Sequence, residues 1–219
     1  MPDVSFEIYP PKSKEGSLQL RQAMRQLAKF DPKFTSVTCG TGGGSVKSTK
    51  DTVQALQAQE IGEIGAHVTC GNRTLADLTG LTHYYRQNNV SAVVALRGDA
   101  PSDISNGPTV PEFVSTLRRT TNLDIYVAAY PQVHPKARNL ATDLDALKEK
   151  QDAGANAAIT QFFFDADVFL RFRDLAIANG VTMPLIPGIL PVTNWAATRS
   201  MAIACGATIE PDLAEGFAR

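Results

Sequence analysis

The sequence predicts a parallel α/β fold, a (β/α)8 TIM barrel that lacks its last β/α unit. Short apolar runs typical of buried strands alternate with segments whose apolar residues recur at helical spacing. The alternation is regular along all 219 residues and gives seven strand-then-helix units of about 30 residues each. Such alternation requires a parallel sheet with right-handed crossovers, and eight units close a barrel of about 250 residues. A complete, open, doubly wound sheet is the competing interpretation.

The predicted strands are apolar runs that end at polar, glycine or proline residues. They cover residues 4–9, 34–39, 64–70, 92–96, 125–130, 157–164 and 184–190. The predicted helices carry an amphipathic stripe or begin at a capping residue, as the helix of residues 74–87 does at Thr74 or Asn72. They cover residues 17–30, 49–61, 74–87, 111–121, 139–153, 168–179 and 194–205.

One stretch, residues 153–165, contains a helix end, a buried strand and a polar amide in a short run. Gly154 ends a helix, the strand that follows is apolar apart from Thr160 and Gln161, and Asp165 opens the next helix. An amide near the C-terminal end of a buried strand is costly unless a polar group meets it, and ligands bind at that end of parallel sheets. Gln161 is therefore either a satisfied core glutamine or a ligand contact.

The composition is that of one globular domain over residues 1–219. Hydrophobic residues make up 43% of the chain, charged residues 20%, and the net charge is −1. This balance indicates no nucleic-acid partner, and no apolar run approaches the roughly 18 residues that span a membrane. Three scattered cysteines and a start without signal-peptide features favour the cytoplasm. The end carries no stop signal, so we expect a chain truncated at its C-terminus.

Polar side chains that could take part in catalysis or ligand binding lie at the C-terminal ends of successive predicted strands. In a barrel these strand ends form the active site. The side chains are Glu7, Thr38, His67, Asp99 after Arg97-Gly98, Tyr130 with His134 just beyond, and Gln161. Burial in an apolar strand would raise the pKa of Glu7 and suit it to general-acid work. Alternatively, Glu7 points to solvent, Arg97 to Asp99 form a structural turn, and His134 is an ordinary loop residue.

Two common nucleotide-binding motifs are not supported, and neither is a metal site. The glycine cluster of residues 40–45 lacks the glycine that a Walker A loop needs before Lys-Ser, because Val46 stands before Lys47. No GxGxxG motif opens a helix after a strand. His67, His83 and His134 do not have zinc-ligand spacing. We predict no metal.

Eight segments, in order and covering nearly the whole chain, resemble the bacterial type of the methylenetetrahydrofolate reductase family. They are VSFEIYPPK (4–12), SVTCG (36–40), HVTC (67–70), VALRGD (94–99), VAAYPQVHP (127–135), DAGAN (152–156), ITQFFFD (159–165) and IPGILP (186–191). The resemblance implies a (β/α)8 barrel that binds FAD. It further implies that NADH or NADPH reduces the flavin, and that the reduced flavin converts 5,10-methylenetetrahydrofolate to 5-methyltetrahydrofolate by ping-pong kinetics, feeding methionine synthesis.

The resemblance also implies roles for single residues. Glu7 would be the acid that opens the folate five-membered ring, Asp99 the acid near flavin and folate, and Gln161 the amide shared by folate and nicotinamide. The positions expected to hold FAD are Thr38 (on the nicotinamide side), His67, Arg97, Gly98, Asp99, Tyr130, His134, Ala137, Asp143 and Lys150. The family also implies a homo-oligomer.

The resemblance implies an eighth strand with a folate-contacting arginine, which we expect to be missing from this chain. The chain also departs from the family in two internal places. The loop after Asp99 reads Gly107-Pro-Thr109-Val110 where the family often has a Tyr-Ala pair, and Met201 stands where close relatives have an aromatic residue. Two rival functions stay open: another FAD barrel oxidoreductase similar to the proline dehydrogenases, and a non-catalytic subunit that binds folate or flavin.

Overall fold

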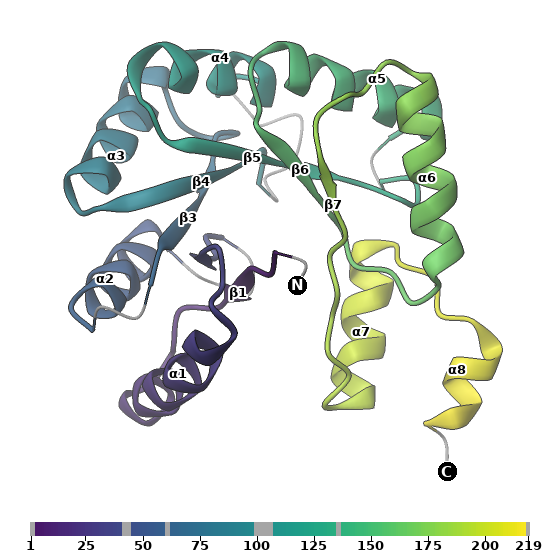
Figure 1. Ribbon diagram of the computed structural model, residues 1–219, viewed down its shortest axis with the longest axis horizontal. Coiled ribbons are helices and arrows are strands. Elements are labelled where there is room, and N and C mark those ends of the chain that lie inside the picture. Colours follow the sequence, from purple (N-terminus) through teal and green to yellow (C-terminus); the bar gives the residue numbers. More distant parts are fainter. Residues whose placement is uncertain (1–2, 41–44, 60–61, 99–106, 135–136, 218–219) are drawn as a thin grey trace. The chain divides into compact units, whose positions relative to one another are not determined.

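In a computed structural model, which describes residues 3–40, 45–59, 62–98, 107–134 and 137–217, strands and helices alternate (Figure 1). The strands are β1 (Phe6–Ile8), β2 (Thr35–Val37), β3 (Ile64–Thr69), β4 (Val90–Leu96), β5 (Asp124–Ala129), β6 (Ala157–Thr160) and β7 (Leu185–Ile186). The helices are α1 (Lys14–Leu27), α2 (Val46–Gln57), α3 (Leu75–Gln87), α4 (Val110–Thr120), α5 (Leu140–Asp152), α6 (Ala166–Ala178), α7 (Trp195–Cys205) and α8 (Pro211–Gly216), with a 3-10 turn η1 (Ala28–Phe30) after α1.

Neighbouring strands of the sheet are also neighbours in the sequence, in the order β1-β2-β3-β4-β5-β6-β7. The pairs β1–β2, β2–β3, β3–β4 and β6–β7 are parallel. A doubly wound sheet reverses its strand order at a switch point, whereas a (β/α)8 fold keeps the order of the sequence. The predicted (β/α)8 fold class is therefore confirmed, with seven repeats in the described residues, and the doubly wound alternative is wrong.

The chain divides into two compact units, Met1–Tyr126 and Val127–Arg219. The first unit contains β1 to β4 with α1 to α4, and the second contains β6 and β7 with α5 to α8. The division falls within β5. The prediction that residues 1–219 form one FAD-binding domain stays a prediction.

The core of the first unit forms around β3 and β4, whose side chains are buried on both faces. Ile64, Val68 and Val93 are fully buried, as expected of a parallel strand covered by helices. Helices α2, α3 and α4 begin at capping boxes. The hydroxyl of Ser45, Thr74 or Thr109 accepts a hydrogen bond from the backbone N–H three residues later, and the side chain of that later residue accepts one from the backbone N–H of the capping residue. The predicted cap at Thr74 is confirmed.

Two element boundaries differ from the sequence prediction for identifiable reasons. Helix α2 begins at Val46 rather than residue 49, because Ser45 caps it. Strand β6 ends at Thr160 rather than residue 164. The three phenylalanines after Gln161 pack as ring pairs instead: Phe162 contacts Phe164, and Phe163 stacks on Phe169 of α6.

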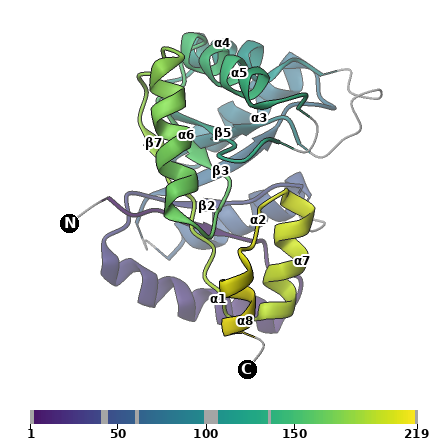
Figure 2. The ribbon, with the colours of Figure 1, turned by 90° about the vertical axis from the view of Figure 1, so that its right-hand side faces the viewer.

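Helix α8 was not predicted, because its six residues are too few to show a helical period. It begins with Pro211 and lies beside α7 in the second unit (Figures 1 and 2). Trp195 of α7 stacks on Phe217 after α8, with 4.9 Å between ring centroids. No helix among the described ranges is long and apolar enough to cross a bilayer.

Candidate active site

Glu7, Ser36 and His67 form one polar cluster in the first unit. Glu7 of β1 is the register partner of Ser36 of β2, and Ser36 is in turn the partner of Gly65, two residues before His67 on β3. Because side chains two residues apart share a face of a strand, all three point the same way. The His67 Nε2 lies 3.2 Å from the Ser36 Oγ and 3.5 Å from the Glu7 Oε2.

The histidine in the contact with Glu7 is uncharged near neutral pH. Burial lowers the pKa of His67 to about 4, so its imidazole carries no charge near neutrality. Partial burial also raises the pKa of the Glu7 carboxyl above its ordinary value, although 49% of that side chain is exposed. A cationic histidine would have the opposite effect on Glu7. The arrangement therefore favours a carboxyl group that keeps its proton and remains accessible, as a general acid requires.

Thr38, directly after β2, has a buried hydroxyl with no hydrogen-bond partner among the described residues. Its backbone is satisfied, since the N–H donates to the Ile8 carbonyl at 2.9 Å and the carbonyl accepts from the Thr49 hydroxyl at 2.8 Å. An unpaired buried hydroxyl is costly, so Thr38 is suited to meet a polar ligand atom.

The turn after β4 brings its backbone close to β3. Gly98 has a φ of +90°, and a Cβ there would lie 3.0 Å from the Thr69 Cβ, so both conformation and space require glycine. Arg73 holds Thr69 from the other side by donating to its hydroxyl at 2.9 Å. Arg97 precedes this turn and is partly exposed. Asp99, the predicted second acid, lies outside the described residues.

A second cluster, in the second unit, surrounds the Lys150 ammonium. Lys150 of α5 donates to the Ala128 carbonyl of β5 at 2.9 Å, and its Nζ lies 6.0 Å from the centre of the Tyr130 ring. Burial lowers the pKa of Lys150 to about 8, while Asp143 and Glu149 act in the opposite direction. A half-buried cation with a single carbonyl partner among the described residues retains donor capacity for an anion.

The other predicted cofactor contacts of the second unit lie around this lysine. The rings of Tyr130 and His134 meet edge to face, 4.4 Å apart. The backbone N–H of His134 donates to the Asp143 carboxylate at 2.8 Å, and the backbone N–H of Ala137 donates to the His134 carbonyl at 2.8 Å. Asp143 therefore fixes the turn that carries His134. Lys136, two residues after His134, lies outside the described residues.

Gln161 is the first residue after β6, so its side chain lies at the strand end as predicted. Its backbone N–H donates to the Ala129 carbonyl at 2.8 Å. Its amide has no hydrogen bond within the described residues and is partly exposed. Within the described residues the amide is therefore available to a ligand, and its role as a ligand contact stays a prediction.

Each unit contains a group of a kind that a dinucleotide flavin needs. In the first unit the unpaired Thr38 hydroxyl offers a hydrogen bond to a polar ring edge. In the second unit the half-buried Lys150 ammonium offers a charge-assisted bond to a phosphate. The structure thus forms one cluster of predicted residues in each unit, Glu7 with His67 in the first and Tyr130, His134, Asp143 and Lys150 in the second.

Two features near these clusters were not anticipated from the sequence. Ser36 contacts His67, but a serine in an apolar strand carries no signal of its own. The loop that replaces the family's Tyr-Ala pair is structural: Thr109 caps α4, Val110 is buried, and a Cβ on Gly107 would lie 2.0 Å from the Cys70 carbonyl oxygen.

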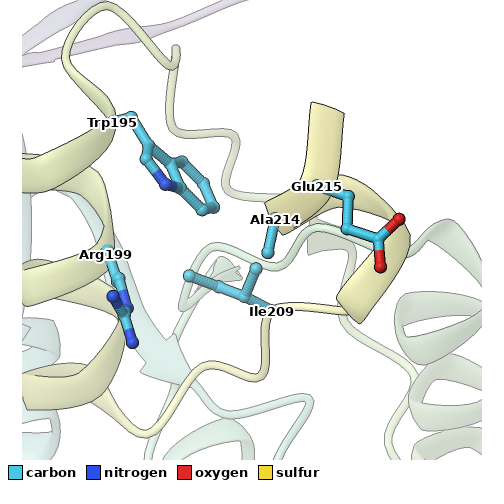
Figure 3. Close-up of a pocket in the computed structure, with 5 residues that line it drawn as sticks. All are labelled: Trp195, Arg199, Ile209, Ala214 and Glu215. Carbon is cyan, nitrogen blue, oxygen red and sulfur yellow. The ribbon is translucent and has the colours of Figure 1, made fainter. Parts of the chain in front are cut away.

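A hollow of about 410 Å³ between α7 and α8 is lined by Trp195, Arg199, Ile209, Ala214 and Glu215 (Figure 3). The predicted site residues are not among those that line it. The described residues also contain no group of three or more histidine, cysteine or acidic side chains that could hold a metal ion.

These features define a class of protein, a parallel (β/α)8-type fold with an acid, a neutral histidine and a half-buried lysine near its strand ends. The methylenetetrahydrofolate reductase family model matches residues 1–219. The chain belongs to this family.

Curated relatives agree with this assignment. The 5,10-methylenetetrahydrofolate reductase of Escherichia coli (strain K12) is 39% identical over 217 residues, which cover 98% of this chain and 73% of that protein. The enzyme of the same name from Salmonella typhimurium is 40% identical over 202 residues, covering 91% of this chain and 68% of that protein. Methylenetetrahydrofolate reductase (NADH) 1 of Arabidopsis thaliana is 33% identical, covering 95% of this chain and 38% of that protein.

Solved structures of low sequence identity share the fold. An uncharacterized protein from Clostridium thermocellum that binds two copies of 5-methyl-5,6,7,8-tetrahydrofolic acid has a TM-score of 0.68 at 15% identity, covering 98% of this chain and 74% of that one. Oxaloacetate acetylhydrolase in complex with oxalate has a TM-score of 0.59 at 13% identity, covering 91% and 72%.

Proposed function

We propose that this chain catalyses the reduction of 5,10-methylenetetrahydrofolate to 5-methyltetrahydrofolate, with FAD as cofactor and NADH or NADPH as reductant. The observation that supports it most strongly is the accessible Glu7 carboxyl, with its raised pKa, against the buried neutral His67. Opening the folate five-membered ring requires a proton donor at the departing nitrogen, and such a carboxyl is suited to donate it. The name of the E. coli relative supports the same substrate.

FAD, when bound, would accept hydride from the nicotinamide and deliver it to the folate. The residues that would hold it are Thr38, His67, Arg97 and Gly98 in the first unit and Tyr130, His134, Ala137, Asp143 and Lys150 in the second. Lys150 would neutralise a phosphate, and Asp143 would hold the His134 turn in place. The Thr38 hydroxyl would meet a polar ring edge. Asp99 keeps its proposed role near flavin and folate.

Gln161 would orient whichever substrate is bound, because its amide can both donate and accept and has no hydrogen bond to the described chain. One amide that serves nicotinamide and folate in turn implies that the two substrates alternate, which gives ping-pong kinetics. Ring opening would then depend on Glu7, and orientation on Gln161.

The test is an anaerobic assay of the FAD-loaded chain for 5-methyltetrahydrofolate formed from 5,10-methylenetetrahydrofolate, with NADH and NADPH compared at equal concentration. Product formation at the expense of the reductant is expected, with parallel lines in double-reciprocal plots. Gln161→Ala should raise the KM for both substrates while flavin content stays unchanged. A wild-type chain that binds folate and flavin but forms no product would contradict the proposal and favour a binding subunit. Oxidation of proline instead would favour the other rival.

A further inference from the structure

We infer that Ser36 is a positioning residue for Glu7 and acts through His67. Ser36 is 2% exposed, so its hydroxyl lies behind the accessible carboxyl and not beside a substrate. Its Oγ is 3.2 Å from the His67 Nε2, which is itself 3.5 Å from the Glu7 Oε2. The inference rests on the proposed function for its kinetic consequences, but the hydrogen-bond chain itself is a property of the three strands.

The partners of Ser36 show which groups donate and which accept in this series of hydrogen bonds. The Ser36 hydroxyl faces the Phe6 carbonyl at 3.5 Å, and a carbonyl can only accept, so the hydroxyl proton is directed there. The Ser36 oxygen is then an acceptor for the N–H of His67, which places the imidazole proton on Nε2. In the structure this N–H is hydrogen-bonded to Ser36 at 3.2 Å, whereas the Glu7 Oε2 lies 3.5 Å from the same nitrogen.

This arrangement favours the protonated form of Glu7. A hydrogen bond donated to a carboxylate stabilises the charged form and lowers the carboxyl pKa. Because Ser36 accepts the hydrogen bond from the Nε2 N–H, His67 fixes the position of Glu7 without a strong bond to its anion. Removing the Ser36 hydroxyl would leave the His67 N–H free to donate to Glu7. The pKa of Glu7 would then fall, and Glu7 would be a poorer proton donor near neutral pH.

The surroundings contain few groups that could act on Glu7 in place of His67. In the described residues β2 has no titratable side chain, and His67 is the titratable residue of β3. Glu7 is itself the titratable residue of β1, and burial is the cause of its raised pKa, with no contribution from a charged neighbour.

The first test is a ¹³C NMR titration of the Glu7 carboxyl in the wild-type chain, Ser36→Ala and Ser36→Thr, with the signal assigned by its loss in Glu7→Gln. Ser36→Ala should lower the Glu7 pKa by about one unit, a tenfold change in proton affinity. Ser36→Thr keeps the hydroxyl and should restore the wild-type titration. Thr82→Val is the matched control, because it removes a buried hydroxyl that bonds to Leu78 in α3 and should leave Glu7 unchanged. An unchanged titration in Ser36→Ala would overturn the inference.

Two further measurements keep the inference falsifiable. Should Ser36→Ala fail to fold, ¹⁵N spectra of wild-type His67 decide: a proton on Nε2 supports the inference, and a proton on Nδ1 contradicts it. In kinetics, Ser36→Ala should move the pH profile of folate reduction to lower pH and leave flavin reduction by the nicotinamide within about twofold. An unmoved profile contradicts the inference. If the wild-type chain reduces no folate, the proposed function fails, while the titration still decides whether Ser36 controls Glu7.

Discussion

The ammonium of Lys150 reaches from helix α5 to the Ala128 carbonyl of strand β5, with 2.9 Å between donor and acceptor. The lysine is half-buried there, and its partial removal from water lowers its pKa to about 8. A cation so placed is costly on its own but is ready to bind an anion without reorganisation. Lys150 is therefore the structural feature of the second unit that most directly supports phosphate binding.

Replacing Lys150 by methionine should weaken FAD binding about 10- to 100-fold, because a hydrogen bond to a charged group contributes roughly 1.5–3 kcal/mol. In the wild-type chain, FAD affinity should fall as the pH rises above about 8, where the free lysine loses its proton. Flavin fluorescence titrations across pH measure both effects. Lys148→Met is the control, since Lys148 lies on the same helix but pairs with Asp152. Equal weakening by both variants would contradict the assignment.

Substituting Glu7 by glutamine keeps the shape of the side chain and removes its transferable proton. The folate half-reaction should slow by about 100-fold or more, while reduction of the flavin by the nicotinamide should be nearly unchanged. In the wild-type chain, the folate half-reaction should decline as the pH rises through the raised pKa of Glu7, because the protonated form is the active one. Stopped-flow measurements separate the two half-reactions. Glu15→Gln, at an exposed position of α1, is the control. Loss of both half-reactions would indicate a structural role for Glu7.

His67 should make stability depend on pH in the acid range. Its pKa is about 4 in the folded chain and 6.5 when unperturbed, so the unfolded state binds more protons between these values. The contribution is fully present above pH 6.5 and is lost as the pH falls through 4, amounting to about 3 kcal/mol. His67→Gln should flatten this part of the urea-unfolding profile, and His83→Gln, at an exposed position of α3, should not. A profile that is identical in His67→Gln would show that the imidazole is not buried in its neutral form.

Gly188 should tolerate no side chain. A Cβ there would lie 2.2 Å from the Thr160 carbonyl oxygen, and the Gly188 N–H already donates to the Thr160 hydroxyl at 2.9 Å. Gly188→Ala should destabilise the chain by about 2 kcal/mol or more, because backbone atoms must move. Gly80→Ala is the matched control: nothing lies within 4 Å of that Cβ, and alanine in a helix is favoured by up to about 1 kcal/mol. Similar denaturation midpoints for the two variants would disprove the close contact.

The alternation of strands and helices was predictable because burial imposes a period on the sequence, and the cap at Thr74 follows from local hydrogen bonding. Strand ends were less predictable, since they depend on partners distant in the sequence. The run after Thr160 is apolar enough for a strand, but its rings pack on one another and on α6.

The candidate site was predictable where a polar residue stood out in an apolar strand, as Glu7 and Gln161 do. The neutral state of His67 could not be predicted in this way, because it depends on burial and on Ser36, a residue that looks ordinary in its own strand. Asp99 stays a prediction, and so do the expected homo-oligomer and the cytoplasmic location.

The central claim, flavin-dependent reduction of a folate, is tested most directly by the visible absorption spectrum of the FAD-loaded chain under anaerobic conditions. Addition of NADH or NADPH should bleach the flavin bands, and addition of 5,10-methylenetetrahydrofolate should restore them with formation of one equivalent of 5-methyltetrahydrofolate. A chain that takes up no FAD, or whose bleached flavin is not reoxidised by the folate, would contradict the account.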